Sequence, residues 1–309
     1  MAAERVATEM YNRVGAEALC ERVNEVKAKG HPLLLQGPMG TMLMSEPFGE
    51  DVPAASWNVS EPQLVERIHG LYRAAGADVL ITNTFQASAP ALERDAVRQS
   101  VAVINRAAVD CARRVGEGLL VGSIGPCGVD WTLEDSPEFR RAREAYREQA
   151  RQLLQAGVDG LLLETFTSIR QTTPALAGVR DASDGMPLWV SFAIDEKGNL
   201  LGDNLNIEAA CMHAAKAGAS AVGVNCCSLA AATASVPRMV RAVDLPVMVR
   251  PNAGSPHRDD EGRLAWNEDP GAFSTACREW IAAGAALVGT CCGATPLTTC
   301  ALADVLAAV

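Results

Sequence analysis

The chain has 309 residues, a formal net charge of −10 and 49% hydrophobic residues. This composition is that of a globular protein and excludes a disordered chain. The acidic balance argues against nucleic acid as a partner, because nucleic-acid binding shows as a basic patch or a high isoelectric point. The unusual number in the composition is ten cysteines.

The N-terminal residues 1–30 are charged and helical in pattern, without the apolar segment of a secretory signal. No stretch reaches 18 apolar residues without a break, so we predict neither a membrane span nor a membrane partner. We therefore expect a cytoplasmic protein, whose thiols stay reduced. In that compartment the cysteines indicate packing, metal ligation or catalysis rather than a disulfide framework.

Eight continuous apolar runs predict strands that are buried on both faces, as in a parallel sheet. The runs are LLLQ (33–36), DVLITN (78–83), LLVGSIGP (119–126), GLLLET (160–165), LWVSFAI (188–194), AVGVNC (221–226), PVMVRPN (246–252) and ALVGTC (286–291). Helical patterns separate them, and the clearest lie at 61–77, 139–157 and 207–218.

A short phrase of small residues precedes four of these strands. It reads AAGAD (74–78), AGVDG (156–160), AGAS (217–220) and AAGAA (282–286). Its glycine is typical of a left-handed helix cap that turns the chain into the next strand.

The alternation of eight strands with helices predicts an α/β fold, a (β/α)8 TIM barrel that takes up residues 1–309 as a single domain. Residues 1–31 are expected to form a short N-terminal helical extension at the barrel bottom. An open doubly wound sheet is the rival fold, but no GxGxxG motif follows the first strand.

Four of the ten cysteines lie where two predicted strands end, as the pairs Cys226–Cys227 and Cys291–Cys292. A barrel places its chemistry at these carboxyl ends. Packing is one interpretation, and a nucleophilic cysteine is another, with His257 as the nearest base. Neighbouring cysteines rarely form a disulfide with each other, because the geometry is strained.

Metal ligation fits these cysteines best. Cys226 and the pair Cys291–Cys292 can converge across the barrel mouth and leave one tetrahedral position of zinc open, as catalytic zinc sites do. Such a site suits alkyl transfer to sulfur, since zinc favours the thiolate form of a bound thiol, which is the nucleophile. Phosphate binding by the glycine-rich loops is an alternative that leaves the cysteines unexplained.

Seven segments match the motifs of a known family in their order along the chain. They are GPMGT (37–41), SEPQLVERIHGLYRAAGADVLITNTFQAS (60–88), GP (125–126), LLLETF (161–166), GVNC (223–226), RPNAG (250–254) and GTCCGATP (289–296). On these motifs the chain resembles the homocysteine S-methyltransferase family. The motifs look closest to the homocysteine-binding barrel of cobalamin-dependent methionine synthase.

The resemblance implies a zinc-dependent methyltransferase of methionine biosynthesis whose small-molecule substrate is a thiol, homocysteine first of all. It implies Cys226, Cys291 and Cys292 as metal ligands, with Cys227 outside the site. It implies a catalytic role for Glu164 beside the homocysteine amino group, where a carboxylate pairs with an ammonium. The further substrate-binding residues that we predict are Gln36, Gly37, Thr41, Asn83, Thr84, Phe85, Asn225 and Asn252.

Two positions depart from the family pattern. Gln36 stands where the family has the Asp of an L-D-G motif, and Ile81 replaces the Glu of E-T-N-T-F. Both changes remove negative charge near the mouth. Either Glu164 holds the amino group alone, or the acceptor is a different thiol, and we favour homocysteine.

The sequence ends one helix after the last predicted strand, so we expect the methyl group to come from a separate donor. The motifs NTF, PNAG and GTCCGATP favour a methyl-corrinoid (cobalamin) protein as partner. The alternative donor is S-methylmethionine or S-adenosylmethionine, for which Trp57, Trp131 and Trp266 in predicted rim loops would offer cation–π surfaces. A non-catalytic zinc barrel is the third alternative, and only Gln36 supports it.

Overall fold

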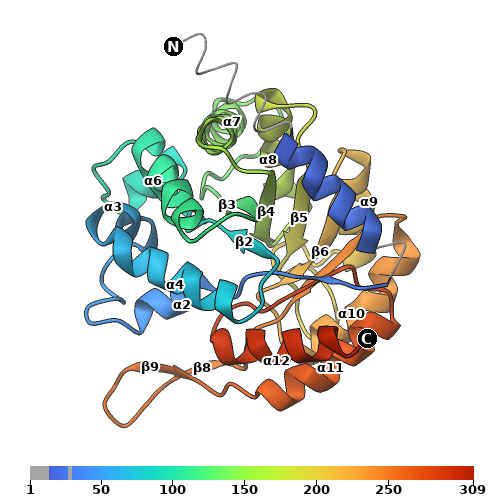
Figure 1. The fold of residues 1–309 in the computed structure, drawn as a ribbon. Helices are drawn as coiled ribbons and strands as arrows, with labels where there is room; N and C mark the ends of the chain where they lie inside the picture. The colour runs from blue at the N-terminus through green and yellow to red at the C-terminus, as the bar shows by residue number, and fades with distance from the viewer. Residues whose placement is uncertain (1–13, 27–29) are drawn as a thin grey trace.

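The computed structural model describes residues 14–26 and 30–309, and eight parallel strands form a barrel at its centre (Figure 1). Their hydrogen-bonded order is β1-β10-β7-β6-β5-β4-β3-β2, and a parallel bridge between Leu35 and Val79 closes the ring. The strands are β1 (Leu33–Leu34), β2 (Val79–Ile81), β3 (Leu119–Ile124), β4 (Gly160–Phe166), β5 (Leu188–Phe192), β6 (Ala221–Asn225), β7 (Val247–Arg250) and β10 (Leu287–Val288). All eight predicted strands are confirmed, and so is the barrel in place of an open sheet.

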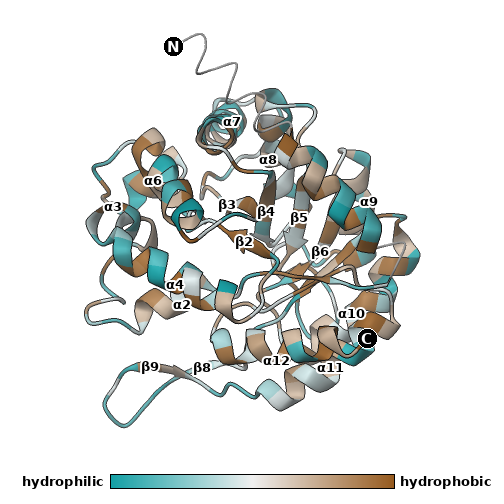
Figure 2. Cartoon of the chain, viewed as in Figure 1, coloured by the Kyte–Doolittle hydropathy of each residue, from teal (hydrophilic) through white to brown (hydrophobic). Residues whose placement is uncertain are grey.

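Helices connect the strands and cover the outside of the barrel. They are α2 (Met39–Met44), α3 (Trp57–Ser60), α4 (Pro62–Ala74), α5 (Ala89–Arg94), α6 (Val101–Arg114), α7 (Pro137–Ala156), α8 (Ile169–Ala182), α9 (Ile207–Lys216), α10 (Leu229–Ala242), α11 (Pro270–Ala282) and α12 (Pro296–Ala307). Figure 2 shows apolar strands at the centre and hydrophilic turns along the outer helices. Within the described residues, no helix is long and apolar enough to cross a membrane.

Left-handed glycines end four of the helices, as the repeated sequence phrase predicts. Gly76, Gly157, Gly218 and Gly284 have φ values of 99°, 100°, 86° and 93°. This region of φ strongly favours glycine, because a side chain there meets its own backbone. Each glycine therefore terminates its helix and redirects the chain into the next strand of the barrel.

A second regularity follows three of these glycines. Two residues on, the side-chain oxygens of Asp78, Asp159 and Ser220 accept hydrogen bonds from strand amides, at 2.8, 2.8 and 2.9 Å. The donating amides belong to the start of the preceding strand, at Leu34, Leu120 and Leu188. These hydrogen bonds therefore connect neighbouring βα units at the bottom of the barrel.

The N-terminal helix closes the barrel bottom. Residues 14–26 are helical, and buried Leu19, Val23 and Val26 join the apolar cluster that fills the barrel interior. A methyl of Leu19 lies so near Gly160, the first residue of β4, that a Cβ there would stand 2.6 Å from it. The predicted extension is thus confirmed for these residues, and residues 1–13 and 27–29 of that prediction lie outside the described part.

The barrel interior changes from apolar to polar along β3, β4, β5, β6 and β7. Leu162 and Met248 belong to the interior apolar cluster. Alternate residues of a strand share a face, so Glu164 and Arg250, two positions further on, face the same interior nearer the carboxyl ends. Ser123, Ser191 and Asn225 reach the interior in the same way on β3, β5 and β6.

A two-stranded hairpin that was not predicted follows β7. It consists of β8 (Pro256–Arg258) and β9 (Leu264–Trp266), paired antiparallel, and it extends away from the barrel (Figure 1). Arg258 in this hairpin forms an ion pair with Glu50, with 2.6 Å between Nη1 and Oε1. The hairpin therefore links the loop after β7 to the loop after α2.

Candidate active site

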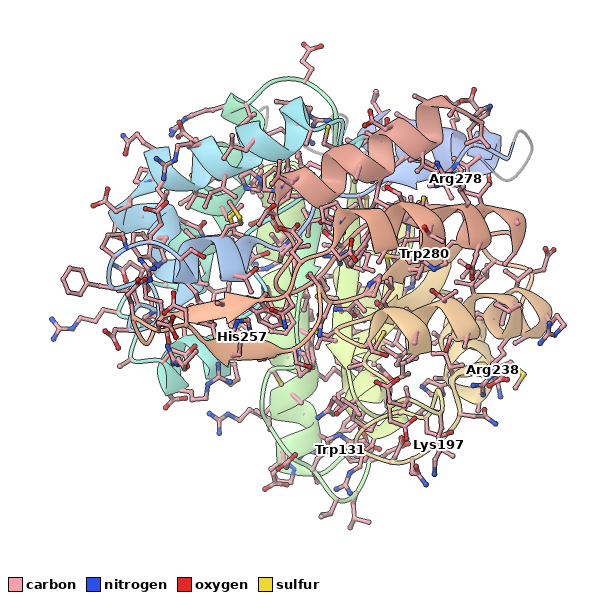
Figure 3. The ribbon with its side chains drawn as sticks, turned by 90° about the horizontal axis from the view of Figure 1, so that it is seen from below. Trp131, Lys197, Arg238, His257, Arg278 and Trp280 are labelled. Atoms are coloured by element: carbon pink, nitrogen blue, oxygen red, sulfur yellow. The ribbon has the colours of Figure 1, made fainter. Side chains whose placement is uncertain are left out.

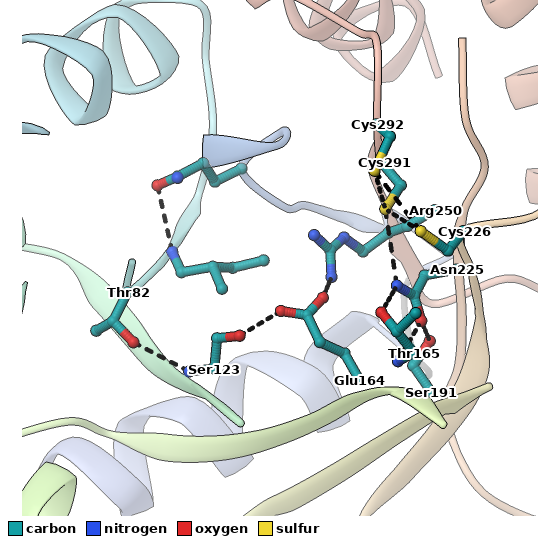
Figure 4. Close-up of polar contacts among 12 residues, drawn as sticks. Thr82, Ser123, Glu164, Thr165, Ser191, Asn225, Cys226, Arg250, Cys291 and Cys292 are labelled. Carbon is teal, nitrogen blue, oxygen red and sulfur yellow. Dashed lines mark hydrogen bonds and ion pairs between the residues drawn. The ribbon is translucent and has the colours of Figure 1, made fainter. Parts of the chain in front are cut away.

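Three cysteines meet at the carboxyl ends of β6 and β10. The sulfur of Cys291 lies 3.5 Å from that of Cys226 and 3.9 Å from that of Cys292, and the third distance is 3.6 Å (Figure 4). Cys291 is buried and the other two are half-buried. The predicted metal-ligand set is therefore brought together, and Cys227 is outside it.

The spacing of the sulfurs fits a tetrahedral metal ion. Thiolates bound 2.3 Å from zinc in tetrahedral geometry lie about 3.8 Å from one another, and the observed distances are 3.5, 3.6 and 3.9 Å. A disulfide needs a separation of about 2 Å. Three thiolates on one side of a common centre suit zinc and leave a fourth position for another ligand.

The loop that follows β7 holds both cysteine segments through its backbone. The amide of Asn252 donates to the carbonyl of Cys227, and the amide of Ala253 donates to the carbonyl of Cys292, each at 2.9 Å. In return the amide of Cys291 donates to the carbonyl of Pro251 at 2.8 Å. Residues 251–253 thus fix the distance between the two cysteine-bearing loops.

Asn225 connects the cysteines to β4 and β5. Its Oδ1 accepts hydrogen bonds from the amide of Thr165 at 2.9 Å and from Ser191 Oγ at 2.7 Å. Its Nδ2 donates to Thr165 Oγ1 at 2.7 Å and to the sulfur of Cys291 at 3.7 Å (Figure 4). The side chain is fully buried, so these partners hold it in one orientation.

Two residues at the site adopt left-handed backbone conformations that are uncommon outside glycine. Thr165 has φ 66° and Cys226 has φ 55°. Each follows an inward-facing polar residue, and the strand register between β4 and β5 shifts at Thr165. This local strain re-aims the ends of β4 and β6, which is a common feature of functional sites.

Glu164 and Arg250 form a buried ion pair beside the cysteines. Arg250 Nη1 lies 2.6 Å from Glu164 Oε2, and the side chains are 4% and 9% exposed. The other carboxylate oxygen, Oε1, accepts a hydrogen bond from Ser123 Oγ (Figure 4). Burial lowers the pKa of Arg250, but the charges of Glu164 and Cys291 outweigh it and raise this pKa, so the guanidinium is charged.

Cys291 is the thiol that ionises first in this cluster. Hydrogen bonding with the thiols of Cys226 and Cys292 holds its pKa well below the usual value, and the positive charge of Arg250 acts in the same direction. The hydrogen bond with Cys226 lowers the pKa of Cys292, but the hydrogen bond with Cys291 and burial together outweigh it and raise this pKa. The arrangement favours one thiolate at the centre before the others form.

Gln36 is directed at α4 rather than at the cysteines. It is 1% exposed, and its Oε1 accepts hydrogen bonds from His69 Nδ1 at 2.8 Å and from the amide of Ile81 at 3.3 Å. Burial and the charge of Arg73 lower the pKa of His69 to about 3. A neutral glutamine therefore matches a neutral histidine in this contact.

Several other predicted substrate residues, all in the loop after β2, are held by neighbouring segments of the chain. Asn83 donates to the carbonyl of Ala54 at 2.7 Å and to Asn58 Oδ1 at 3.0 Å. Thr84 Oγ1 donates to the carbonyl of Ser123 at 2.6 Å. Phe85 packs against Gly125, where a Cβ would stand 2.4 Å from its ring.

The glycine-rich loop after β1 lies against the cysteine loop. A Cβ on Gly37 would stand 2.8 Å from Thr290 Oγ1, so this position requires glycine. Thr41 Oγ1, on α2, accepts a hydrogen bond from the amide of Gly293 at 3.3 Å. Asn252 keeps an Oδ1 that is buried without a hydrogen-bond partner among the described residues.

Two of the three tryptophans differ from their predicted loop positions, since Trp57 lies in α3 and Trp266 ends strand β9. Trp57 begins α3 and is buried in the core, which corrects its assignment to a rim loop. Trp131 lies at the edge of the molecule, stacked with Arg170 at 5.2 Å (Figure 3). Trp266 packs on Gly293, next to Cys292, where a Cβ would stand 2.4 Å from its ring.

The remaining histidine and cysteine alternatives have different outcomes. His257 is exposed on the β8–β9 hairpin (Figure 3) and makes no contact with the cysteine cluster among the described interactions. Among the cysteines outside the cluster, Cys111, Cys211 and Cys277 are buried in the core, whereas Cys20 and Cys300 are exposed.

Ser123, Ser191, Thr165 and Arg250 belong to the site but were not predicted. Arg250 ends an otherwise apolar strand, PVMVR, two positions after the interior residue Met248. Counting in steps of two from the apolar interior would have placed Arg250 and Ser123 in the mouth. Thr165 contributes to the site through its left-handed backbone conformation. A threonine in the sequence does not indicate that conformation.

A closed barrel with a three-cysteine cluster at its carboxyl end is the fold of an enzyme, with a donor set that suits a metal ion and chemistry at sulfur. The sequence profile of the homocysteine S-methyltransferase family matches residues 33–306. The chain therefore belongs to this family of methyltransferases.

Known relatives agree with this assignment. Homocysteine S-methyltransferase of Escherichia coli (strain K12) is 30% identical over 298 residues, which cover 87% of this chain and 94% of that protein. Methionine synthase of Mycobacterium leprae is 31% identical over 254 residues, which cover 77% of this chain but only 21% of that protein. The metallated crystal structure of the homocysteine methyltransferase MmuM from Escherichia coli has a TM-score of 0.75 at 25% identity, covering 92% of this chain and 99% of that one.

Proposed function

We propose that the protein transfers a methyl group to the sulfur of homocysteine, giving methionine, with zinc held by Cys226, Cys291 and Cys292. The observation that carries this proposal is the triangle of sulfurs at 3.5, 3.6 and 3.9 Å. When bound, zinc supplies Lewis acidity that favours the thiolate form of the acceptor sulfur at neutral pH.

The side chains around the cysteines bind and orient the acceptor. Glu164 offers a carboxylate to the acceptor ammonium, and Ser123 and Arg250 hold that carboxylate in place. Asn225 fixes Cys291 relative to β4 and β5. A fixed acceptor sulfur has less orientational freedom to lose when it meets the methyl donor.

Metal analysis tests the ligand set. We expect one zinc per chain in the purified protein, and a large loss of zinc and of methyl transfer in Cys291→Ser, because two thiolates no longer enclose the ion. Cys227→Ser is the matched control, since Cys227 is the buried neighbour outside the cluster. Full zinc occupancy in Cys291→Ser would contradict the proposed site.

Two classes of methyl donor are consistent with this acceptor site. The motif resemblance supports a methyl-corrinoid protein. The position of Trp266 supports a sulfonium donor such as S-methylmethionine or S-adenosylmethionine, because its ring lies on Gly293 beside Cys292 and an aromatic face attracts a cation.

Donor choice is decided by supplying homocysteine with methylcobalamin, S-methylmethionine or S-adenosylmethionine in separate reactions. If the donor is a sulfonium, Trp266→Ala lowers kcat/KM for it about tenfold, the value of a cation–π contact of roughly 1–2 kcal/mol. Trp131→Ala, at the outer edge, is the control. Methionine formed from S-methylmethionine alone contradicts the corrinoid proposal, and methionine formed from methylcobalamin alone contradicts the sulfonium one.

A further inference from the structure

The buried pair of Arg250 and Glu164 has one charge of each sign at the barrel mouth. Nη1 of Arg250 lies 2.6 Å from the carboxylate of Glu164. The Nε atom of Arg250 is also buried, but it has no hydrogen-bond partner among the described residues. A buried donor without a partner is costly, because it has lost water and gained nothing. The guanidinium therefore has a free donor for an incoming acceptor atom.

The carboxylate side of the pair also has capacity for a ligand. Ser123 and Arg250 each occupy one oxygen of Glu164, whereas a carboxylate accepts up to four hydrogen bonds. Gln36 is neutral and bound to His69, so it adds no second negative charge. An ammonium group that enters this site is left with Glu164 as its counter-ion.

The balance of charge selects between ligands. An ammonium alone beside Glu164 would place a second cation near Arg250, and like charges in a buried site repel strongly. A carboxylate alone beside Arg250 would repel Glu164 for the same reason. A ligand that carries both charges on one carbon can place its ammonium beside Glu164 and its carboxylate beside Arg250. Each charge then has a neighbour of opposite sign.

We propose that Arg250 binds the α-carboxylate of the thiol acceptor while its partner Glu164 binds the α-ammonium, so that the pair selects zwitterionic amino-acid thiols. This inference rests on the proposed function, and it deepens that function by assigning a specificity-determining residue. Arginine suits the role because its planar fork keeps one edge on Glu164 and offers other N–H groups to a second carboxylate.

The test compares three acceptors that share the same thiol. They are L-homocysteine, 3-mercaptopropylamine, which lacks the carboxylate, and 4-mercaptobutanoate, which lacks the ammonium. The wild-type enzyme should prefer homocysteine over each analogue by about 100-fold in kcat/KM, the range expected for losing a buried charge partner. This comparison needs no variant and so does not depend on folding. Equal use of homocysteine and 3-mercaptopropylamine would overturn the proposal.

Substitutions of Arg250 test whether this residue causes the preference for homocysteine. Arg250→Gln should raise KM for homocysteine about 100-fold and leave 3-mercaptopropylamine nearly unchanged, and Arg250→Lys should restore part of the preference. Arg238→Gln, which removes an arginine from an ion pair with Glu208 between outer helices, is the control and should keep the wild-type preference. A loss that is equal for all three acceptors would indicate a structural role for Arg250 and refute the proposal.

Calorimetric binding of the same thiols separates this inference from the proposed function. If no donor yields a methylated product, methyl transfer to homocysteine is refuted, but binding still tests Arg250. Homocysteine affinity that falls in Arg250→Gln while the amine affinity stays constant supports the proposal. Equal binding of homocysteine by Arg250→Gln and by wild type contradicts it.

Discussion

A single buried contact at the barrel mouth joins two uncharged polar side chains, Gln36 and His69. The glutamine oxygen accepts from Nδ1, which therefore carries a proton, and burial favours the neutral imidazole by lowering the pKa of His69. A carboxylate at position 36 would favour the charged imidazole and bury an ion pair at that point. Gln36→Asp is therefore expected to change the protonation state of His69 on α4 as well as the charge near the substrate.

His69 makes stability depend on pH. Its pKa is about 3 in the folded protein and near 6.5 when unfolded. Between these values the unfolded chain binds the extra proton, so stability falls as pH drops below 6.5, by up to about tenfold in the folding constant per pH unit. Urea unfolding at pH 7 and pH 5 measures this.

His69→Asn keeps a donor for Gln36 and removes the titration, so its loss of stability between the two pH values should be smaller than that of the wild type. His257→Asn, on the exposed hairpin, controls for removal of an imidazole. An unchanged difference in His69→Asn would contradict the assignment.

Individual site residues differed in how far their roles could be read from sequence. The meeting of Cys226 with Cys291 and Cys292 was predictable, because all three follow the ends of strands that share one rim of the barrel. Gln36 was placed near the substrate by motif, whereas its actual partner, His69, comes from a helix whose packing the motif does not describe. Arg250 was overlooked because its partner Glu164 lies 86 residues away in sequence.

At the scale of secondary structure, the recurring joint between helix and strand organises the barrel bottom. A left-handed glycine ends the helix, and a side-chain oxygen two residues later ties the next strand to the preceding one. Asp159 shows the device most fully, since it also pairs with Arg113 at 3.0 Å. The three units that contain this joint therefore enter the sheet in the same way.

Asp159→Ala should lower the free energy of unfolding by about 2–4 kcal/mol. The change leaves the buried amide of Leu120 without its acceptor. It also removes the carboxylate that pairs with Arg113, which keeps its hydrogen bonds to the carbonyls of Gly118 and Gly157. The control is Asp95→Ala, which breaks a more exposed pair with Arg94 and should cost less than about 1 kcal/mol. Similar losses in both variants, measured by chemical denaturation, would refute this role.

Elements with a strong apolar or glycine signal were predictable, and those without it were not. Continuous apolar runs located every barrel strand, because those strands are buried on both faces. The β8–β9 hairpin has no such run, since 256–266 is mostly charged or polar. Trp57 was assigned to a loop because α3 is only four residues long and has no periodic pattern of its own.

Across the whole molecule, stability and chemistry lie at opposite ends of the barrel. The N-terminal helix packs Leu19 into the bottom, where the strands begin. The cysteines, Glu164 and Arg250 lie at the carboxyl ends of the strands, separated from Leu19 by the apolar interior. This division is typical of barrel enzymes, whose catalytic loops all leave from one face.

Leu19→Ala should therefore destabilise the fold without changing the site. A cavity of this kind costs about 2–5 kcal/mol, whereas zinc content and KM for homocysteine should stay as in the wild type below the melting temperature. Val14→Ala, on the exposed side of the same helix, is the control and should be nearly neutral. A raised KM in Leu19→Ala would show that the two ends are coupled.

The short loop 251–253 has a consequence for how this barrel can diversify. It sets the spacing of the cysteine-bearing loops through main-chain groups alone, with Asn252, Ala253 and Cys291 as donors. Side chains in the hairpin that follows are therefore exchangeable without disturbing the three cysteines, apart from Trp266, which packs on Gly293 beside Cys292. A chimera that receives residues 256–265 from another member of the family should keep the triangle of sulfurs while the surface of this hairpin changes.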